Sequence, residues 1–425
     1  MTRPPEALAL SALEWLAGSA RRTGDGLQWS GTPSAGEVDP TLYSGAAGIV
    51  LAFLEAERHF GDDRWADAAA AGARALARDI ESWDHHSLYF GTMGMAVALH
   101  EVAEHLGDPG AERAARAALE RTRTSFDGER WASQFDLLGG NAGIAVGALR
   151  LGDVELAELA ATPYLRRAEA TPAGVIWENR TGADHRKHHI SHGTLGIAYA
   201  LAATAHATGR DDLMALAVAG VDDVVSRNGA DESGFLVPHS DPQQAPDLVE
   251  RYSYGWCHGP SGDAHVFRLL HQQSREPRWL DLQDRCWRTV VESGVPRRIR
   301  PGFWDNSGRC CGTAGVLALA CDRMVETGEE PAFATVLVAD LDGRATLDSD
   351  GARWSNYEHR AATPDLEPRQ GWAMGNAGII RELLRYVRIT EGRDPSYAVQ
   401  WPDHPPAVGS SRHPSRASDP RRSTR

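Results

Sequence analysis

The chain has 425 residues, of which 42% are hydrophobic, and a formal net charge of −14 at pH 7. This length could hold two or three domains or one large assembly of repeats, and the apolar content suffices for a large core. The negative charge argues against nucleic acid as a partner, because phosphates require a basic face. No run of about 18 apolar residues is present, so we expect no membrane span.

The chain begins with an amphipathic helix pattern over residues 1–20, which lacks the continuous apolar segment of a signal peptide. The cysteine count is five, an odd number, which indicates reduced thiols and predicts a cytoplasmic protein. At the other end, residues 402–425 are rich in Pro, Ser and Arg, and we expect them to be disordered. Residues 1–401 are expected to form a single domain.

One motif recurs seven times along this domain: Gly-x-x-Gly followed by an apolar helical run, roughly 50 residues apart. Before each motif the pattern predicts a second helix that carries charged residues on one side. The first glycines of the motifs are Gly45, Gly91, Gly140, Gly193, Gly259, Gly312 and Gly375. The partner helices are expected at residues 4–20, 63–81, 109–126, 154–170, 211–228, 277–294 and 331–342.

These two helix sets predict an all-α fold, an α/α toroid of seven inner and seven outer helices. The apolar motif helices are expected inside and their charged partners outside. Each inner helix is preceded by an antiparallel outer helix, so all seven inner helices run parallel and their N-termini meet at one end. The positive ends of the helix dipoles would favour anions and thiolates there.

Three cysteines are expected to meet at that end, because Cys257, Cys310 and Cys311 directly precede two successive motifs. Three thiolates suit Zn²⁺, which takes sulfur and nitrogen ligands in a tetrahedral shell. The fourth position could belong to His192, to His258 or to an exchangeable water, and an open position would be typical of a catalytic site. The remaining two cysteines fall inside helical patterns and are expected in the core: Cys286 and Cys321.

Histidines also gather before the motifs. His192 directly precedes Gly193 and is predicted to be a ligand or an acid/base group, the alternative being a hydrogen-bonded histidine at a helix start. For three further histidines, a surface or loop position is the simpler expectation: His185, His188 and His189.

The stretches GWCHGPSGDA and RCCGTAG, with SHGTLGIAYAL upstream, resemble the lanthionine synthetase C-like (LanC-like) cyclases. The repeats carry this resemblance over about residues 5–390. The family's fold is an α/α toroid with zinc at its centre. Its members install thioether rings in ribosomally made peptides, by adding a cysteine thiol to a dehydroalanine or dehydrobutyrine that another enzyme has made.

The resemblance implies roles for five residues. The zinc ligands fall on Cys257, Cys310 and Cys311, where the third ligand is Cys instead of the family's more common His. The family's active-site histidine falls on His192, and its active-site aspartate falls on Asp136 in FDLLGGNAG. The implied cofactor is Zn²⁺.

One position departs from the family pattern. Many members have an arginine four residues before the first zinc cysteine, where this chain has Ser253, and the nearest arginine is Arg251. Either Arg251 takes that role through a shifted loop, or the role is absent.

The implied reaction is the addition of a cysteine thiolate to Cβ of the dehydro residue, followed by protonation of Cα. His192 could donate that proton or could remove the thiol proton, and Asp136 could orient the imidazole. The chain has no room for a dehydratase domain, so the expected partners are a dehydrated precursor peptide and a separate dehydratase.

Other functions remain open at this stage. The same zinc chemistry could add a small thiol, such as glutathione, to dehydroamino acids. The toroid could instead be a non-catalytic, zinc-stabilised scaffold in a peptide-maturation complex. Glycosidase chemistry would need two carboxylates in the cavity, and near the motifs Asp136 and Asp263 are the candidates.

Overall fold

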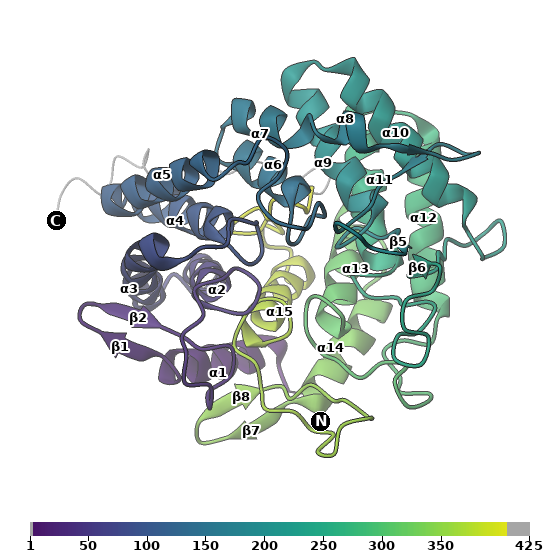
Figure 1. Ribbon diagram of the computed structural model, residues 1–425. Helices are drawn as coiled ribbons and strands as arrows, with labels where there is room; N and C mark the ends of the chain where they lie inside the picture. The colour runs from purple at the N-terminus through teal and green to yellow at the C-terminus, as the bar shows by residue number, and fades with distance from the viewer. Residues whose placement is uncertain (1–2, 406–425) are drawn as a thin grey trace.

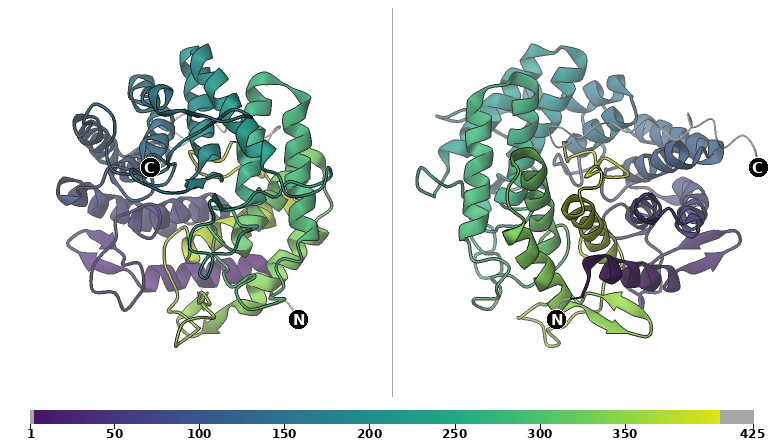
Figure 2. Two further views of the ribbon diagram at one scale, coloured as in Figure 1. Left: turned by 45° about the vertical axis from the view of Figure 1, so that its right-hand side comes forward. Right: turned by 180° about the vertical axis from the view of Figure 1, so that it is seen from behind.

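The computed structural model describes residues 3–405, and helices dominate this range. The predicted all-α toroid is confirmed, with seven inner and seven outer helices around a common centre (Figures 1 and 2). The inner helices are α2 (Ala46–Phe60), α4 (Thr92–Leu106), α6 (Asn141–Arg150), α9 (Thr194–Thr208), α11 (Pro260–Ser274), α13 (Thr313–Thr327) and α15 (Asn376–Thr390). The outer helices are α1 (Pro5–Gly18), α3 (Asp63–Asp79), α5 (Pro109–Thr124), α7 (Val154–Ala161), α10 (Asp211–Ser226), α12 (Pro277–Glu292) and α14 (Ala332–Arg344).

The tight helix hairpins join each inner helix to the outer helix that follows it, and not to the one before it. The first hairpin is tight because one helix ends and the next begins within two residues. Helix α2 ends at Gly61, whose left-handed conformation (φ 66°) stops the helix. Asp62 then caps α3, because its side chain accepts a hydrogen bond from the amide of Arg64. The outer helix that has no inner helix before it, α1, packs against α15 and closes the ring (Figure 1).

Burial separates the two helix sets as the polarity pattern predicts. Every residue from Thr92 to Leu99 in α4 is buried, whereas α3 buries one face and leaves its charged face in solvent. The faces meet through large side chains, and the ring of Phe53 on α2 stacks on Trp65 of α3 at a centroid distance of 5.7 Å. A helix that is apolar all round has to be enclosed, so the inner ring forms the core.

A closed ring of seven backbone hydrogen bonds joins the repeats at the N-terminal end of the inner helices. In each repeat, the residue two before the first motif glycine donates its amide to the carbonyl of the equivalent residue in the next repeat, over 2.8–3.4 Å. These hydrogen bonds hold the seven equivalent residues next to one another in a ring at this end of the toroid. The participating residues are Tyr43, Tyr89, Leu138, Ser191, Cys257, Cys310 and Ala373.

The second glycine of each motif allows adjacent repeats to approach at this ring. At Gly143, an added Cβ would overlap the carbonyl oxygen of Leu137 and lie 2.9 Å from the Cβ of Leu88 in the preceding repeat. The position therefore has no room for a side chain, which explains why the motif keeps a glycine there.

The chain after α15 packs inside the toroid. Trp401 stacks on Trp372 at 4.6 Å, Asp403 accepts a hydrogen bond of 2.5 Å from the Tyr89 hydroxyl, and His404 contacts Asp322 at 2.7 Å. The expectation of a disordered tail from residue 402 is therefore wrong for residues 402–405, because these side chains complete the core. The rest of the expected tail, residues 406–425, lies outside the described range.

Four short antiparallel strand pairs lie in the loops between the helices. They are β1 (Arg21–Thr23) with β2 (Gly26–Gln28), β3 (Glu169–Ala170) with β4 (Val175–Ile176), β5 (Arg186–Lys187) with β6 (Ser240–Asp241), and β7 (Thr346–Asp348) with β8 (Gly351–Arg353). Among residues 3–405, no helix combines the length and apolar character that crossing a membrane requires.

Candidate metal centre and neighbouring histidine

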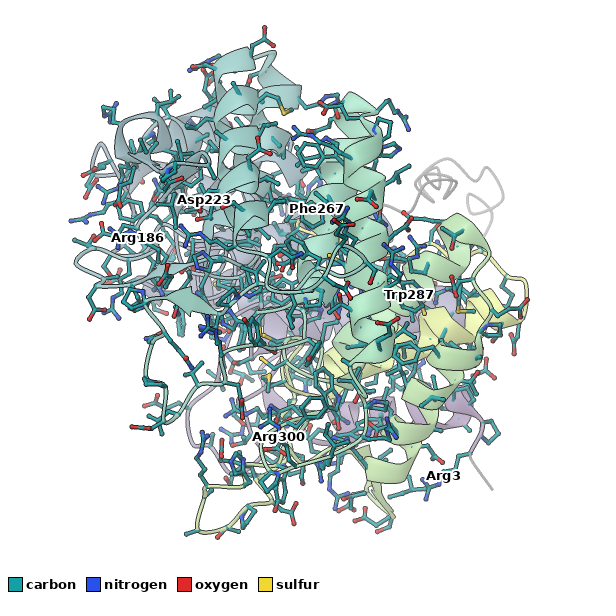
Figure 3. The ribbon with its side chains drawn as sticks, turned by 90° about the vertical axis from the view of Figure 1, so that its right-hand side faces the viewer. Arg3, Arg186, Asp223, Phe267, Trp287 and Arg300 are labelled. Atoms are coloured by element: carbon teal, nitrogen blue, oxygen red, sulfur yellow. The ribbon has the colours of Figure 1, made fainter. Side chains whose placement is uncertain are left out.

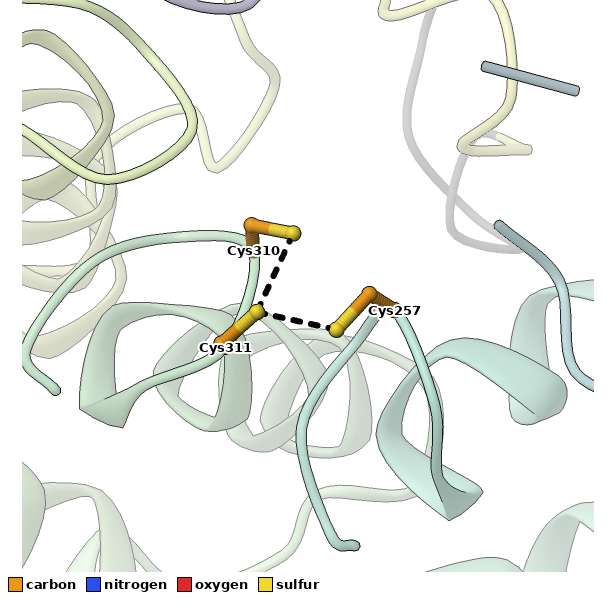
Figure 4. A group of neighbouring side chains, drawn as sticks. All are labelled: Cys257, Cys310 and Cys311. Atoms are coloured by element: carbon orange, nitrogen blue, oxygen red, sulfur yellow. Dashed lines mark hydrogen bonds between the residues drawn. The ribbon is translucent and has the colours of Figure 1, made fainter. Parts of the chain in front are cut away.

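Three thiols lie together at the end of the toroid where the inner helices begin (Figure 4). The Sγ atoms of Cys257 and Cys311 are 3.0 Å apart, and those of Cys311 and Cys310 are 3.4 Å apart. All three sulfur atoms lie within 4.8 Å of one another and none is in a disulfide. The structure thus brings together the three cysteines that the sequence predicted to meet.

The repeat architecture explains how residues 53 positions apart converge. Cys257 and Cys310 occupy neighbouring positions in the ring of backbone hydrogen bonds, and the Cys257 amide donates to the Cys310 carbonyl at 3.1 Å. Cys311 is the next residue and directly precedes Gly312, the N-cap of α13. One thiol therefore comes from the loop before α11, and two come from the loop before α13 in the adjacent repeat.

The three thiols titrate as a group. Hydrogen bonds from Cys257 and Cys311 hold the pKa of Cys310 well below its ordinary value. Hydrogen bonds with Cys310 and Cys311, together with burial, raise the pKa of Cys257 well above its ordinary value. For Cys311 the hydrogen bond with Cys257 lowers the pKa, but the contact with Cys310 and burial outweigh it and raise the pKa well above the ordinary value. A single negative charge is stable in this cluster, whereas further thiolates require a cation to balance them.

The donor set fits Zn²⁺. Three sulfurs converge from two rigid loops, and the polar side chain hydrogen-bonded to the cluster is the Tyr43 hydroxyl, which donates to Cys310 Sγ at 3.4 Å. Within the described chain, no guanidinium or ammonium is bonded to these sulfurs. Three protein ligands would leave one position of a tetrahedral shell for water or substrate.

A cavity of about 200 Å³ borders the cluster on the side of Cys311. Its walls combine aromatic and polar side chains, so a ligand has access to the cysteines from this side. Besides Cys311, the lining includes Ser253, Phe303, Tyr357 and Arg360.

His192 and Asp136 form a hydrogen-bonded pair beside this cluster. His192 Nδ1 lies 2.9 Å from Asp136 Oδ2, and Asp136 Oδ1 accepts from the Gly139 amide at 2.7 Å. Asp136 is fully buried, whereas the His192 side chain keeps 23% of its surface exposed. The carboxylate fixes the proton on Nδ1, which leaves Nε2 free to exchange a proton with a substrate.

Two of the histidines for which surface or loop roles were expected are in fact buried. His188 and His189 have no exposed surface, and His189 Nδ1 pairs with the buried Asp263 at 2.7 Å. The expected loop position is confirmed, since both residues lie between β5 and the start of α9, but a surface position is wrong because this loop lies inside the ring. His185 is partly exposed, and its Nδ1 lies 2.9 Å from Asp184.

Further residues around the site had weak signals in the sequence. His258 is half-buried and lies between His239, at a ring-centroid distance of 3.8 Å, and His192, at 5.6 Å. His239 lies in the long loop between α10 and α11, where no repeat pattern marks it. Tyr43, by contrast, has the same place in its repeat as Cys257 has in its own, so the repeat alignment could have assigned it to the site.

Arg251 does not line the cavity beside Cys311. Its side chain is exposed and lies over the ring of Tyr252 at 5.6 Å, whereas Ser253 lines the cavity beside Cys311. The core roles expected for the other two cysteines are confirmed, since Cys286 and Cys321 are fully buried in α12 and α13.

The family described as "Lanthionine synthetase C-like protein" matches residues 36–244 and 242–338, and the chain belongs to this family. Among solved structures, "Nisin cyclase" superposes with a TM-score of 0.61 at 15% identity, covering 82% of this chain and 89% of that one. A protein from Listeria innocua gives 0.52 at 11% identity over 92% and 99% of the two chains.

An α-mannanase from Bacteroides thetaiotaomicron gives a TM-score of 0.51 at 12% identity, with coverage of 92% and 97%. At these identities the superpositions establish the shared toroid and nothing beyond it. A comparison with curated proteins finds no significant match.

Proposed function

We propose that this chain is a zinc-dependent peptide cyclase, which adds cysteine thiols to dehydroalanine or dehydrobutyrine and forms (methyl)lanthionine thioether rings. The convergence of three thiols beside an imidazole–carboxylate pair carries this proposal, and membership of the LanC-like family supports it. A dehydrated precursor peptide would be the substrate, supplied by a separate dehydratase in a reducing cytoplasm that keeps the thiols free.

Cys257, Cys310 and Cys311 would hold the metal, and Zn²⁺ would favour the thiolate form of a substrate cysteine. The Tyr43 hydroxyl would fix the orientation of Cys310. Burial, with the nearby thiols, raises the pKa of Tyr43, so this hydroxyl stays protonated and remains a donor.

His192 would carry the proton of the reaction. Its Nε2 accepts the proton of the substrate thiol, and the sulfur lone pair forms the new bond to Cβ. The π electrons of the Cα=Cβ bond move onto Cα and the adjacent carbonyl, giving an enolate. His192 then returns the proton to Cα, so the reaction is an isomerisation with no change in mass. Asp136 would hold the imidazole in place through both steps.

Two alternative functions, a zinc-stabilised scaffold and a glycosidase, would each require a different arrangement of side chains. A closed, purely structural zinc site would need a fourth protein ligand, but of the two groups with metal-binding spacing among the described residues, the one at this end of the toroid contains the three cysteines alone. For glycosidase chemistry the two carboxylates would have to face a common cavity, whereas Asp136 and Asp263 are each buried against their own histidine.

Addition of a small thiol keeps one observation in its favour, the modest volume of the cavity at Cys311, about 200 Å³. A single assay separates it from cyclisation. A peptide with one dehydroalanine and one cysteine is incubated with the zinc-loaded protein, with and without glutathione. Ring closure removes the alkylatable thiol at constant mass, whereas addition of glutathione increases the mass of the peptide.

We expect ring closure, its loss in the Cys310→Ala/Cys311→Ala variant, and its retention in Cys286→Ala, which alters a buried cysteine away from the site. A wild-type protein that leaves the peptide thiol alkylatable would overturn the proposal. A product that carries glutathione would favour the small-thiol function.

A further inference from the structure

Lys187 is the only lysine in the sequence, in which every other basic side chain is an arginine. It ends β5, directly before the loop that carries His188, His189 and His192 into the site. Its carbonyl accepts a hydrogen bond from Thr194 Oγ1 at 3.5 Å, which ties it to the first turn of α9. Its backbone position is therefore set by the helix at whose start His192 lies.

The strand geometry turns Lys187 inward. In β5, Arg186 pairs with Asp241 and Lys187 pairs with Ser240 of β6. Successive side chains of a strand point to opposite faces. Arg186 lies at the periphery (Figure 3) and makes an ion pair with Glu169 at 2.7 Å. Lys187 therefore lies on the face of the strand pair opposite to that of Arg186, and it is half-buried there.

The charge of Lys187 acts on the groups of the candidate site. Burial lowers its pKa, and the charges of Asp136 and Cys257 partly offset this effect. In turn, its ammonium contributes to the lowered pKa of His239. The backbone independently places Lys187 beside His192: a Cβ added at the neighbouring Gly193 would lie 2.5 Å from the carbonyl carbon of Lys187.

This ammonium has no partner of its own. Over residues 3–405, it makes no hydrogen bond or ion pair, although the side chain is half-buried. Arginines near the cavity are engaged elsewhere: Arg300 pairs with Glu250 at 2.7 Å, and Arg360 donates to the Leu248 carbonyl at 2.6 Å. A half-buried cation without a counter-ion is available to an incoming negative charge.

We propose that the Lys187 ammonium binds the carbonyl oxygen of the dehydro residue and stabilises the negative charge that develops there, which makes Lys187 a further catalytic residue. This inference rests on the proposed cyclase function. The thiolate pair forms the C–S bond, the π pair becomes the enolate beside Lys187, and the proton reaches Cα from His192. Lys187 gains and loses no atom in the step. A cation aimed at the site of developing charge stabilises the transition state more than the ground state.

The single lysine allows a selective experiment. Lys187→Met removes the cation while keeping the length of the side chain, and Lys187→Arg keeps the cation. On a dehydrated, cysteine-containing peptide, we expect Lys187→Met to slow ring closure by about 10²–10³-fold, mainly in kcat. We expect Lys187→Arg to remain within about tenfold of wild type, and both variants to keep their zinc.

Amine chemistry gives a second readout that does not depend on turnover. An acetylating reagent modifies Lys187 and the α-amino group of the chain, and mass spectrometry follows each separately. A dehydrated peptide without cysteine should protect Lys187 and leave the α-amino group unprotected. Acetylation should inactivate wild type but not Lys187→Arg.

The experiments distinguish a failure of the proposed cyclase function from a failure of the role proposed for Lys187. A wild-type protein that forms no thioether overturns the proposed function, and protection of Lys187 then still decides whether Lys187 contacts the dehydro residue. If wild type cyclises while Lys187→Met cyclises equally fast, or if Lys187→Met loses its zinc, the catalytic role of Lys187 is refuted. Equal acetylation of Lys187 with and without peptide also refutes it.

Discussion

The two ends of the toroid bury polar groups in opposite ways. Where the inner helices begin, thiols and imidazoles meet, and several imidazole nitrogens have no partner, including Nδ1 of His258 and Nδ1 of His239. Deeper in the ring, the buried carboxylate of Asp322 is already paired with cationic groups. Asp322 contacts Arg268, Arg385 and His404, each at 2.7 Å.

This difference separates a site for ligands from a site for stability. Two residue groups in the described chain have the spacing to hold a metal ion, the three cysteines and the set of His265, Asp322 and His404. Burial alone would raise the pKa of Asp322, but Arg268, His404 and Arg385 hold it well below the ordinary value. A carboxylate neutralised by two arginines has no charge left for a metal, so we assign the metal to the cysteines and a structural role to the deeper cluster.

The largest expected effect tests the structural role of the segment after α15, which packs inside the toroid. Deleting residues 396–425 removes Tyr397 and Trp401 from the core and His404 from Asp322. Loss of each large aromatic costs about 3–5 kcal/mol, and typical domain stabilities are about 5–15 kcal/mol. We expect no folded protein by circular dichroism and size-exclusion chromatography. A truncated protein that folds with the thermal midpoint of wild type would contradict this account.

A single substitution at the deeper cluster should have the next largest effect. Asp322→Asn leaves Arg385 without its counter-ion and leaves Arg268 with Glu326 alone, and breaking a buried pair in this way costs about 3–5 kcal/mol. Asp284 makes a comparable pair with Arg323 at 2.7 Å but is 45% exposed, so Asp284→Asn should cost at most about 1 kcal/mol. Urea unfolding measures both, and similar midpoints would refute the comparison.

At the other end, substitution should change the rate and spare the fold. We expect His192→Ala to keep its zinc and to close rings about 10²–10⁴-fold more slowly. Asp136→Asn should cause a smaller loss, because the imidazole remains but is less well oriented. His206 is exposed on the same helix, α9, and His206→Ala should cyclise like wild type. Loss of zinc in His192→Ala would instead make His192 the fourth ligand.

The smallest effect is expected for a change of ligand type. Cys311→His replaces one anionic ligand by a neutral one. We expect zinc to stay bound and ring closure to slow by roughly fivefold, about 1 kcal/mol in the barrier. Metal analysis and the thiol-alkylation assay measure the two quantities. Complete loss of zinc would show that the loop geometry accepts sulfur only.

The sequence predicted those features that the repeat imposes. Glycine spacing placed all seven inner helices, and the equivalence of Cys257 and Cys310 placed two thiols side by side before any coordinates were known. Features that depend on non-repeated segments were missed. His239 lies in an irregular loop, and Asp403 and His404 belong to a stretch whose composition is typical of disorder. Their burial follows from the space left inside the ring, which no local pattern encodes.

Metal content is the most direct test of the central claim that the cysteine cluster, and not the deeper cluster, holds the metal. Wild type should contain about one zinc per chain, and Cys310→Ala/Cys311→Ala should contain little or none. Two matched controls should keep the metal, Cys286→Ala in α12 and His404→Gln in the deeper cluster. If the double cysteine variant retains full zinc, or if zinc is lost with His404→Gln, the assignment of the metal centre is contradicted.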